Sequence, residues 1–183
     1  MIYYEDKKIK IRDIEKGDII NLFSCRIDKE INRYDPRPIP SNSKELIQEC
    51  KMHCDNFERN VINEKLEDRM YKYFIITDNE ENFIGFVNFF SIDTVAKQGE
   101  MGVTIGDKRY WRKGIAYDSI KIAVNYIFNT MDINRIYVEI EENNKPSLAL
   151  FNKLGFKKCD EYLEDEEFKF IVMDIRSHNN KIQ

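Results

Sequence analysis

The stretch that decides the fold reads Tyr110-Trp111-Arg112-Lys113-Gly114-Ile115-Ala116-Tyr117. It lies between a predicted strand at 100–105 and a segment at 114–131 in which apolar residues recur at helical spacing. Gly114 allows a sharp turn and the close approach of an anion. The N–H groups of residues 112–117 would then point to one spot, at the positive end of the helix. The stretch therefore predicts a strand, a turn and a helix that bind a pyrophosphate through the backbone.

One other interpretation of this stretch stays open, namely a plain surface turn in which Arg112 and Lys113 are solvated cations. Nothing here matches a P-loop, because the Gly-Lys-Ser/Thr that would hold magnesium is missing. We therefore expect a site that needs no metal.

The rest of the chain alternates between strand and helix patterns. Alternating, β-branched or aromatic segments predict strands at 8–12, 71–77, 83–92, 100–105, 133–141, 156–162 and 167–175. Helices are expected at 13–26, after an Asn42–Glu45 capping box, at 114–131, and between Pro146 and Gly155. This order predicts an α/β (α+β) fold with one mixed, mostly antiparallel central sheet of about seven strands and about four flanking helices.

Composition limits the class of protein. The 183 residues show no linker or repeat, so we expect one domain at 1–183, with a core at about 8–175 and a frayed tail from Ser177. The net charge of −4 and the pI near 5.4 argue against a nucleic-acid partner. No apolar run is long enough for a membrane span, and no signal peptide is visible.

Four cysteines are scattered along the chain without a paired framework, which favours a reduced, cytoplasmic setting: Cys25, Cys50, Cys54 and Cys159. Cys50, His53 and Cys54 would share one face of a helix and could bring three soft ligands together. A structural zinc site needs four ligands, so we interpret them as ordinary helix residues and expect no metal site.

A second motif lies about thirty residues after the first. It begins Asn143-Asn144-Lys145-Pro146-Ser147 and ends Lys153-Leu154-Gly155-Phe156. It is similar to the Asn-x-x-Ser…Lys-x-Gly-Phe segment of the GNAT superfamily of N-acetyltransferases. Trp111, Gly114 and Ala116 resemble that family's Gln/Arg-x-x-Gly-x-Gly/Ala loop, in the form typical of ribosomal-protein N-terminal, spermidine and aminoglycoside acetyltransferases. The resemblance covers about 8–175 and is strongest at 99–156.

The resemblance implies a site for acetyl-CoA. It assigns the pyrophosphate to the turn and the helix start, with contacts from Trp111, Arg112, Lys113, Gly114, Ile115, Ala116 and Tyr117. It implies that the strand around 101–105 splays from its neighbour, so that the backbone of Val103, Thr104 and Ile105 binds the pantetheine arm and supplies an oxyanion hole. Asn143 would hydrogen-bond the pantetheine, and Phe151 would line the site.

The resemblance also suggests two catalytic residues. Glu100 stands where the family often has its general base, although an exposed carboxylate that attracts a cationic substrate would look the same. Phe151 occupies the position of the family's usual tyrosine acid and has no hydroxyl. Ser147 is then the candidate proton donor. Its alternative role is to cap the helix, and the thiolate could also leave unassisted.

The sequence therefore predicts an acyl-CoA-dependent N-acetyltransferase that acts by direct attack of a primary amine in a ternary complex. The acceptor, a small molecule or a peptide amine, is not identified. Its determinants are expected in the loops at 28–37 and 58–69, where Asp28, Glu30 and Asp35 could attract a cation. A non-catalytic acyl-CoA-binding sensor and a nucleotide-binding module are the alternatives, and a homodimer stays open.

Overall fold

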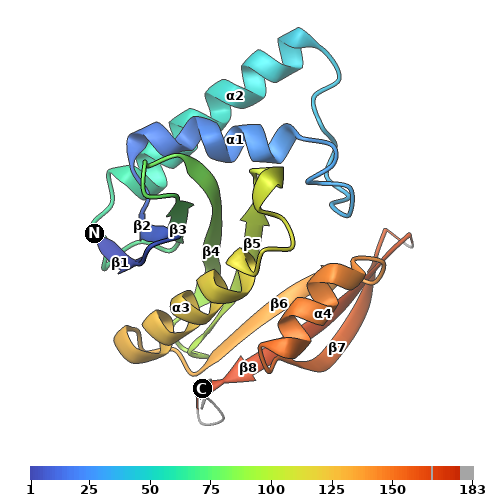
Figure 1. Cartoon of the computed structure of the whole chain (residues 1–183). Coiled ribbons are helices and arrows are strands. Elements are labelled where there is room, and N and C mark those ends of the chain that lie inside the picture. The colour runs from blue at the N-terminus through green and yellow to red at the C-terminus, as the bar shows by residue number, and fades with distance from the viewer. Residues whose placement is uncertain (166, 178–183) are drawn as a thin grey trace.

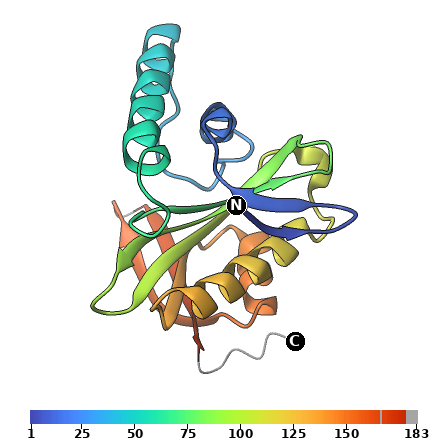
Figure 2. The same ribbon diagram turned by 90° about the vertical axis from the view of Figure 1, so that its left-hand side faces the viewer.

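In a computed structural model, which describes residues 1–165 and 167–177, the chain forms one eight-stranded sheet with helices on both faces (Figures 1 and 2). The spatial order of the strands is β1-β2-β3-β4-β5-β6-β8-β7. Neighbouring strands are antiparallel except β5 and β6, which are parallel. Their bounds are β1 Ile2–Glu5, β2 Lys10–Asp13, β3 Lys72–Thr77, β4 Phe83–Asp93, β5 Gln98–Ile105, β6 Arg135–Glu141, β7 Lys157–Glu164 and β8 Phe168–Arg176.

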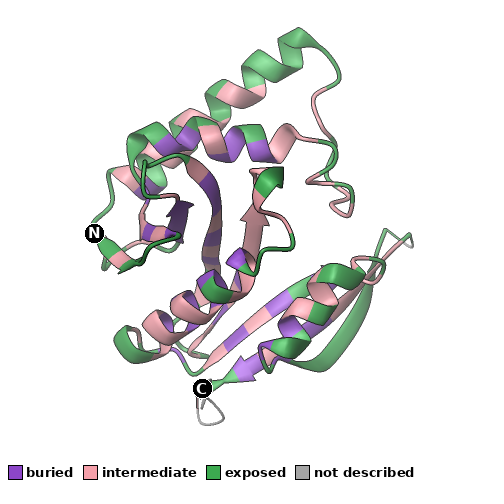
Figure 3. Cartoon of the chain, viewed as in Figure 1, coloured by how far each residue is buried: buried purple, intermediate pink, exposed green. Residues whose placement is uncertain are grey.

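The α-helices are divided between the two faces of the sheet (Figure 2). One face carries α1 (Ile19–Ile27) and α2 (Ser43–Phe57), and the other carries α3 (Ile115–Thr130) and α4 (Lys145–Lys153). The larger core lies between the sheet and α3 and α4, and contains the fully buried Phe74, Phe89 and Phe156. By contrast, α2 has no buried residue, and every residue of β7 is exposed (Figure 3). No helix of the described part is long and apolar enough to cross a membrane.

The fold class is as predicted, and the differences are local. Strand β1 was missed because it is a four-residue edge strand with a mostly exposed surface. The helix expected at 13–26 begins only at Ile19, after a short 3₁₀ turn, because Asp13 still pairs within the sheet. Asn42 caps α2 by accepting from the N–H groups of Lys44 and Glu45, both at 3.0 Å. The tail prediction falls mainly on 178–183, outside the described residues.

The sheet opens between its two parallel strands. β5 pairs with β6 only at Gln98, Gly99 and Glu100, whereas its pairing with β4 continues to Ile105. β6 meanwhile turns toward β8 and pairs with it along its whole length. The two strands therefore diverge after Glu100 (Figure 1), which leaves the backbone of residues 101–105 without a strand partner on the β6 side.

Candidate active site

A cleft of about 1020 Å³ lies where β5 and β6 part, between the start of α3, the first turns of α4 and the loop that precedes α2. Twelve of the fourteen predicted site residues line it: Glu100, Val103, Thr104, Ile105, Trp111, Arg112, Gly114, Ile115, Ala116, Tyr117, Ser147 and Phe151. Lys113 and Asn143 do not. We call this space the β5–β6 cleft.

The start of α3 forms an open cradle at one end of the β5–β6 cleft. Gly114 is the N-terminal cap of the helix and has φ +82°, and Arg112 is also left-handed at φ +60°. The first hydrogen bond of the helix runs from Asp118 N–H to the Gly114 carbonyl, so the N–H groups of the first turn have no helical partner. A Cβ at Gly114 would meet nothing nearer than Asp118 Oδ2, at 4.0 Å. The space in front of the cradle is therefore free for an anion.

Three aromatic contacts hold the cradle in place. Trp111 donates from Nε1 to the carbonyl of Ile105 at 2.8 Å, which ties the turn to the end of β5. That bond occupies one of the backbone groups predicted to face the pantetheine arm. The Lys113 ammonium lies 5.4 Å from the centre of the Tyr110 ring, and Lys153 lies 4.8 Å from that of Tyr117. Lys113 thus supplies positive charge beside the cradle although it does not line the cleft.

Glu100 is the last residue of β5 that pairs with β6, so its side chain lies at the point where the sheet opens. Burial, followed by the nearby carboxylate of Glu139, raises the pKa of Glu100 to about 7, and Arg37 acts in the opposite direction. At neutral pH a carboxyl group with this pKa is partly ionised, so it can accept a proton from an amine. Glu139 in turn accepts a hydrogen bond from the Tyr162 hydroxyl at 2.6 Å.

Helix α4 brings Ser147 and Phe151 to the opposite wall of the β5–β6 cleft. The Ser147 N–H donates to the side chain of Asn144 at 3.2 Å, so Asn144 caps the helix. The Ser147 hydroxyl is a separate group, and it has no hydrogen-bond partner in the described part. Phe151 is 2% exposed and packs edge-to-face on Phe156 with ring centres 5.0 Å apart.

Asn143, the asparagine predicted to bind pantetheine, does not line the β5–β6 cleft. The Asn143 amide donates to Glu141 at 2.8 Å, and its N–H donates to the same carboxylate at 3.0 Å. Asn144 and Glu141 line the cleft in its place. The predicted contact between Asn143 and pantetheine stays a prediction, and it would require the Asn143 side chain to turn.

Arg37 ends the predicted acceptor loop at 28–37, whereas several other cleft residues were not predicted: Glu139, Glu141, Asn144, Tyr162 and Glu164. The alternation of β6, in which Val138 and Ile140 face the core, could have placed Glu139 and Glu141 on the cleft side. No sequence pattern predicts Tyr162 and Glu164 as cleft residues, because β7 lies near the cleft only as a result of the strand order β6-β8-β7.

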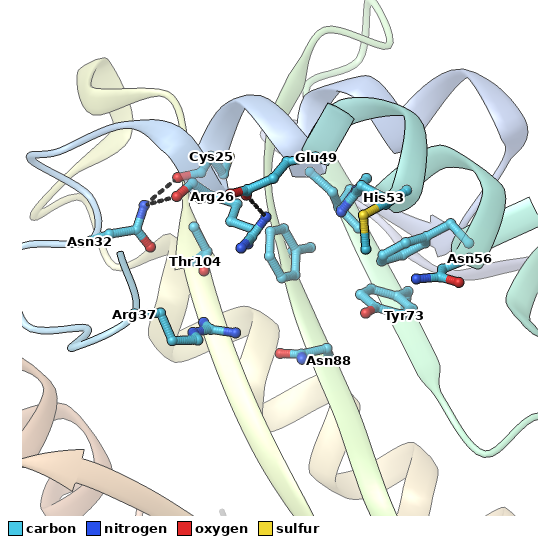
Figure 4. A pocket seen from close by; sticks show the side chains of 14 residues that line it. Cys25, Arg26, Asn32, Arg37, Glu49, His53, Asn56, Tyr73, Asn88 and Thr104 are labelled. Carbon is cyan, nitrogen blue, oxygen red and sulfur yellow. Dashed lines mark hydrogen bonds and ion pairs between the residues drawn. The ribbon is translucent and has the colours of Figure 1, made fainter. Parts of the chain in front are cut away.

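A second cavity of about 720 Å³ lies over the other face of the sheet, beneath α1 and α2 (Figure 4). We call it the α1–α2 pocket. It shares Asn32, Arg37 and Thr104 with the β5–β6 cleft, so the two spaces adjoin. Of the predicted acceptor loops, 28–37 contributes to both cavities, and no residue of 58–69 lines either. Asp28 and Glu30 are bound to Lys108, at 3.0 and 2.7 Å.

On the cysteine and histidine face of α2, His53 packs against aromatic side chains. His53 lies with Nε2 3.2 Å from the Ile19 carbonyl, and its ring packs against Phe57 and Phe23. Burial lowers the pKa of His53, so the ring is neutral at pH 7. In the described ranges, no group of three or more His, Cys, Asp or Glu side chains is placed to hold a metal ion.

Known proteins share this sequence pattern and this fold. The family described as "Acetyltransferase (GNAT) domain" matches residues 8–157. The uncharacterized N-acetyltransferase p20 of Bacillus licheniformis is 26% identical over 178 residues, which cover 95% of this chain and 92% of that protein. The spermidine N(1)-acetyltransferase of Vibrio cholerae is 21% identical over 160 residues, which cover 87% and 85%.

The fold is also that of a solved structure. The crystal structure of spermidine N-acetyltransferase from Vibrio cholerae, in complex with CoA and spermine, superimposes with a TM-score of 0.74 at 20% identity. The match covers 94% of this chain and 98% of that one.

Proposed function

Because the chain belongs to the GNAT acetyltransferase family, we propose that it transfers the acetyl group of acetyl-CoA directly to the primary amine of a small acceptor, within a ternary complex. The observation that carries the proposal is the position of Glu100. Its carboxyl group, with a pKa of about 7, lines the β5–β6 cleft at the point where β5 parts from β6. The family and the free thiols of all four cysteines support a reducing, cytoplasmic setting.

The residues present fit acetyl-CoA. The free N–H groups at the start of α3 and the cations Arg112 and Lys113 suit its pyrophosphate. The backbone of Val103 and Thr104 has no strand partner on the β6 side, which suits the strand-like hydrogen bonds of the pantetheine arm. The cleft has the size of a site for a large ligand.

When bound, acetyl-CoA supplies a thioester whose carbonyl carbon the amine attacks and whose C–S bond then breaks. Glu100 takes the proton that the amine nitrogen loses as it becomes an amide. A backbone N–H of β5 beyond Glu100 donates to the carbonyl oxygen, where negative charge develops. The Ser147 hydroxyl, which has no other partner in the described part, gives a proton or a hydrogen bond to the departing sulfur.

No covalent intermediate on the protein is needed. No cysteine lines the β5–β6 cleft among the described residues. Cys25 lines the α1–α2 pocket, but burial raises the pKa of its thiol to about 11, so it is protonated at neutral pH. Both facts favour direct attack by the amine.

Thiol release separates an enzyme from an acyl-CoA sensor. The protein is incubated with acetyl-CoA and a panel of polyamines, aminoglycosides, amino acids and short peptides, and free CoA thiol is measured. We expect at least one amine to accelerate thiol release. Tight binding of acetyl-CoA with no release for any amine would support the sensor instead.

Acetyl-CoA binding is expected to be independent of metal. The cradle consists of backbone N–H groups and side-chain cations, which neutralise the pyrophosphate without a divalent ion. Calorimetric titration with acetyl-CoA should give the same Kd with and without EDTA. If chelation abolishes binding and Mg²⁺ restores it, the cradle does not bind the pyrophosphate in this way.

Ser147 is expected to affect turnover modestly, and Phe151 hardly at all. Ser147→Ala should lower kcat about 10-fold, because a thiolate can leave without full protonation. Phe151→Tyr adds the hydroxyl that related enzymes carry and keeps the aromatic packing on Phe156, so the rate should stay within about 2-fold. A rise of an order of magnitude or more in Phe151→Tyr would show that the natural enzyme has no working acid, and that Ser147 serves only the helix.

A further inference from the structure

The α1–α2 pocket has an unusual charge balance for a site that receives an amine. Among its fourteen lining residues, the charged ones are Arg26, Arg37 and Glu49. Glu49 is paired with Arg26 at 2.7 Å (Figure 4), so among the lining residues only the charge of Arg37 is not neutralised by another lining residue. This charge balance disfavours the second ammonium group of a polyamine.

Arg37 is exposed and paired with Asp35, yet part of its guanidinium group is left for an anion. Its Nε lies 2.9 and 3.0 Å from the two carboxylate oxygens of Asp35, and Nη2 also binds Asp35. This pair orients the guanidinium group into the pocket (Figure 4) and leaves Nη1 without a partner in the described part of the chain. The hydrogen bond and charge of Asp35 raise the pKa of Arg37, and Glu100 and Glu164, which line the same cleft as Arg37, add to this rise.

The rest of the pocket is uncharged. Tyr73, Asn88 and Thr104 rise from the sheet, and Asn56 descends from α2 (Figure 4). The side chains of Asn56 and Asn88 have no hydrogen-bond partner within residues 1–165 and 167–177. Apolar walls come from residues that include Leu22, Phe57 and Phe86. Such walls and free amides suit an uncharged side chain.

We propose that the acceptor is an α-amino acid with an uncharged side chain. Its carboxylate pairs with Nη1 of Arg37, its amine faces Glu100, and its side chain enters the α1–α2 pocket. This inference rests on the proposed acetyltransferase function and adds the class of acceptor. Glu100 and Arg37 both line the β5–β6 cleft, and Arg37 also lines the α1–α2 pocket, so their opposite charges match the ammonium and carboxylate of one small molecule.

Matched acceptors test the proposal. Free leucine, methionine, phenylalanine and glutamine are compared with their α-carboxamides, which keep the amine and side chain but lack the carboxylate, and with spermidine. In the wild type we expect kcat/KM for the best amino acid to exceed that for its amide by about 10- to 100-fold, the effect of one charge-assisted pair.

Arg37→Gln should remove this preference. Its acid-to-amide ratio of kcat/KM should fall to about 1, and Arg37→Lys, which keeps the charge, should retain part of it. The ratio is independent of any general loss of activity from a changed environment of Glu100. Arg59→Gln is the control, because Arg59 is exposed, lines neither cavity, and carries the same change of charge.

The outcomes separate the two proposals. If amides or spermidine are acetylated as well as or better than amino acids, the acceptor assignment is wrong and the acetyltransferase function stands. If Arg37→Gln keeps the acid-to-amide ratio, Arg37 is not the carboxylate site. If no amine in the panel releases thiol, the proposed function itself fails.

Discussion

We expect Glu100→Gln to lower kcat by about 10²- to 10⁴-fold, or roughly 3–5 kcal/mol of barrier, while the Kd for acetyl-CoA stays within about 2-fold. Glutamine keeps the size of the side chain at the junction of β5 and β6 but cannot accept the proton. The measurement is steady-state thiol release with the best amine, together with calorimetric binding of acetyl-CoA. Glu64→Gln, an exposed position that lines neither cavity, is the charge-matched control.

The pKa of Glu100 determines the direction in which the rate should change with pH. The pKa of Glu100 is raised to about 7, so the carboxyl group is protonated and inactive as a base below that pH, and ionised above it. The wild-type kcat/KM, which reports the pKa of the free enzyme, should therefore rise through an inflection near pH 7. Glu100→Gln should lack this inflection and recover only at high pH, as the free amine accumulates. If the variant keeps the wild-type pH–rate profile, a water chain or a group on the acceptor takes the proton.

Gly114→Asp is expected to weaken acetyl-CoA binding by about 1–4 kcal/mol, or roughly 5- to 1000-fold in Kd, while the fold survives. The substitution places a negative charge at the cap of α3, where the pyrophosphate is to bind. The side chain meets open space, with Asp118 Oδ2 as its nearest neighbour at 4.0 Å, so a steric clash is not the cause. Calorimetry with acetyl-CoA and a thermal melt measure the two effects separately.

Gly114→Ala is the matched control for backbone strain. Gly114 has φ +82°, a conformation that costs any other residue about 1 kcal/mol, so both variants lose similar stability. Only the aspartate adds charge. If Gly114→Asp binds acetyl-CoA as well as Gly114→Ala does, the start of α3 does not hold the pyrophosphate.

Local sequence signals identified the parts of the site that depend on local geometry. Gly114 marks the left-handed cap of α3, and Pro146 and Gly155 bound α4 as expected, with Gly155 at φ +93°. Glu100 could be placed because its strand and the following turn lie next to each other in sequence. These features arise within a few residues, where turn and cap preferences act directly.

Other parts of the site depend on contacts between distant segments. Arg37 lies in a proline-rich loop whose path is set by packing beside the opened sheet, and Tyr162 reaches Glu139 only because β7 lies beyond β8. Asn143 and Asn144 are adjacent, and no local rule tells which one turns inward. The structure turns Asn144 inward because Asn143 binds Glu141.

The most direct test of the account asks whether the acetyl group passes straight to the amine. The protein, at a concentration similar to that of acetyl-CoA, is mixed with acetyl-CoA alone, and thiol release and the intact protein mass are followed before the best amine is added. The account predicts no burst of thiol and no acetylated protein in the first phase, then one thiol released per acetylated amine. A stoichiometric burst with an acetylated protein, or no thiol release even after the amine is added, would contradict it.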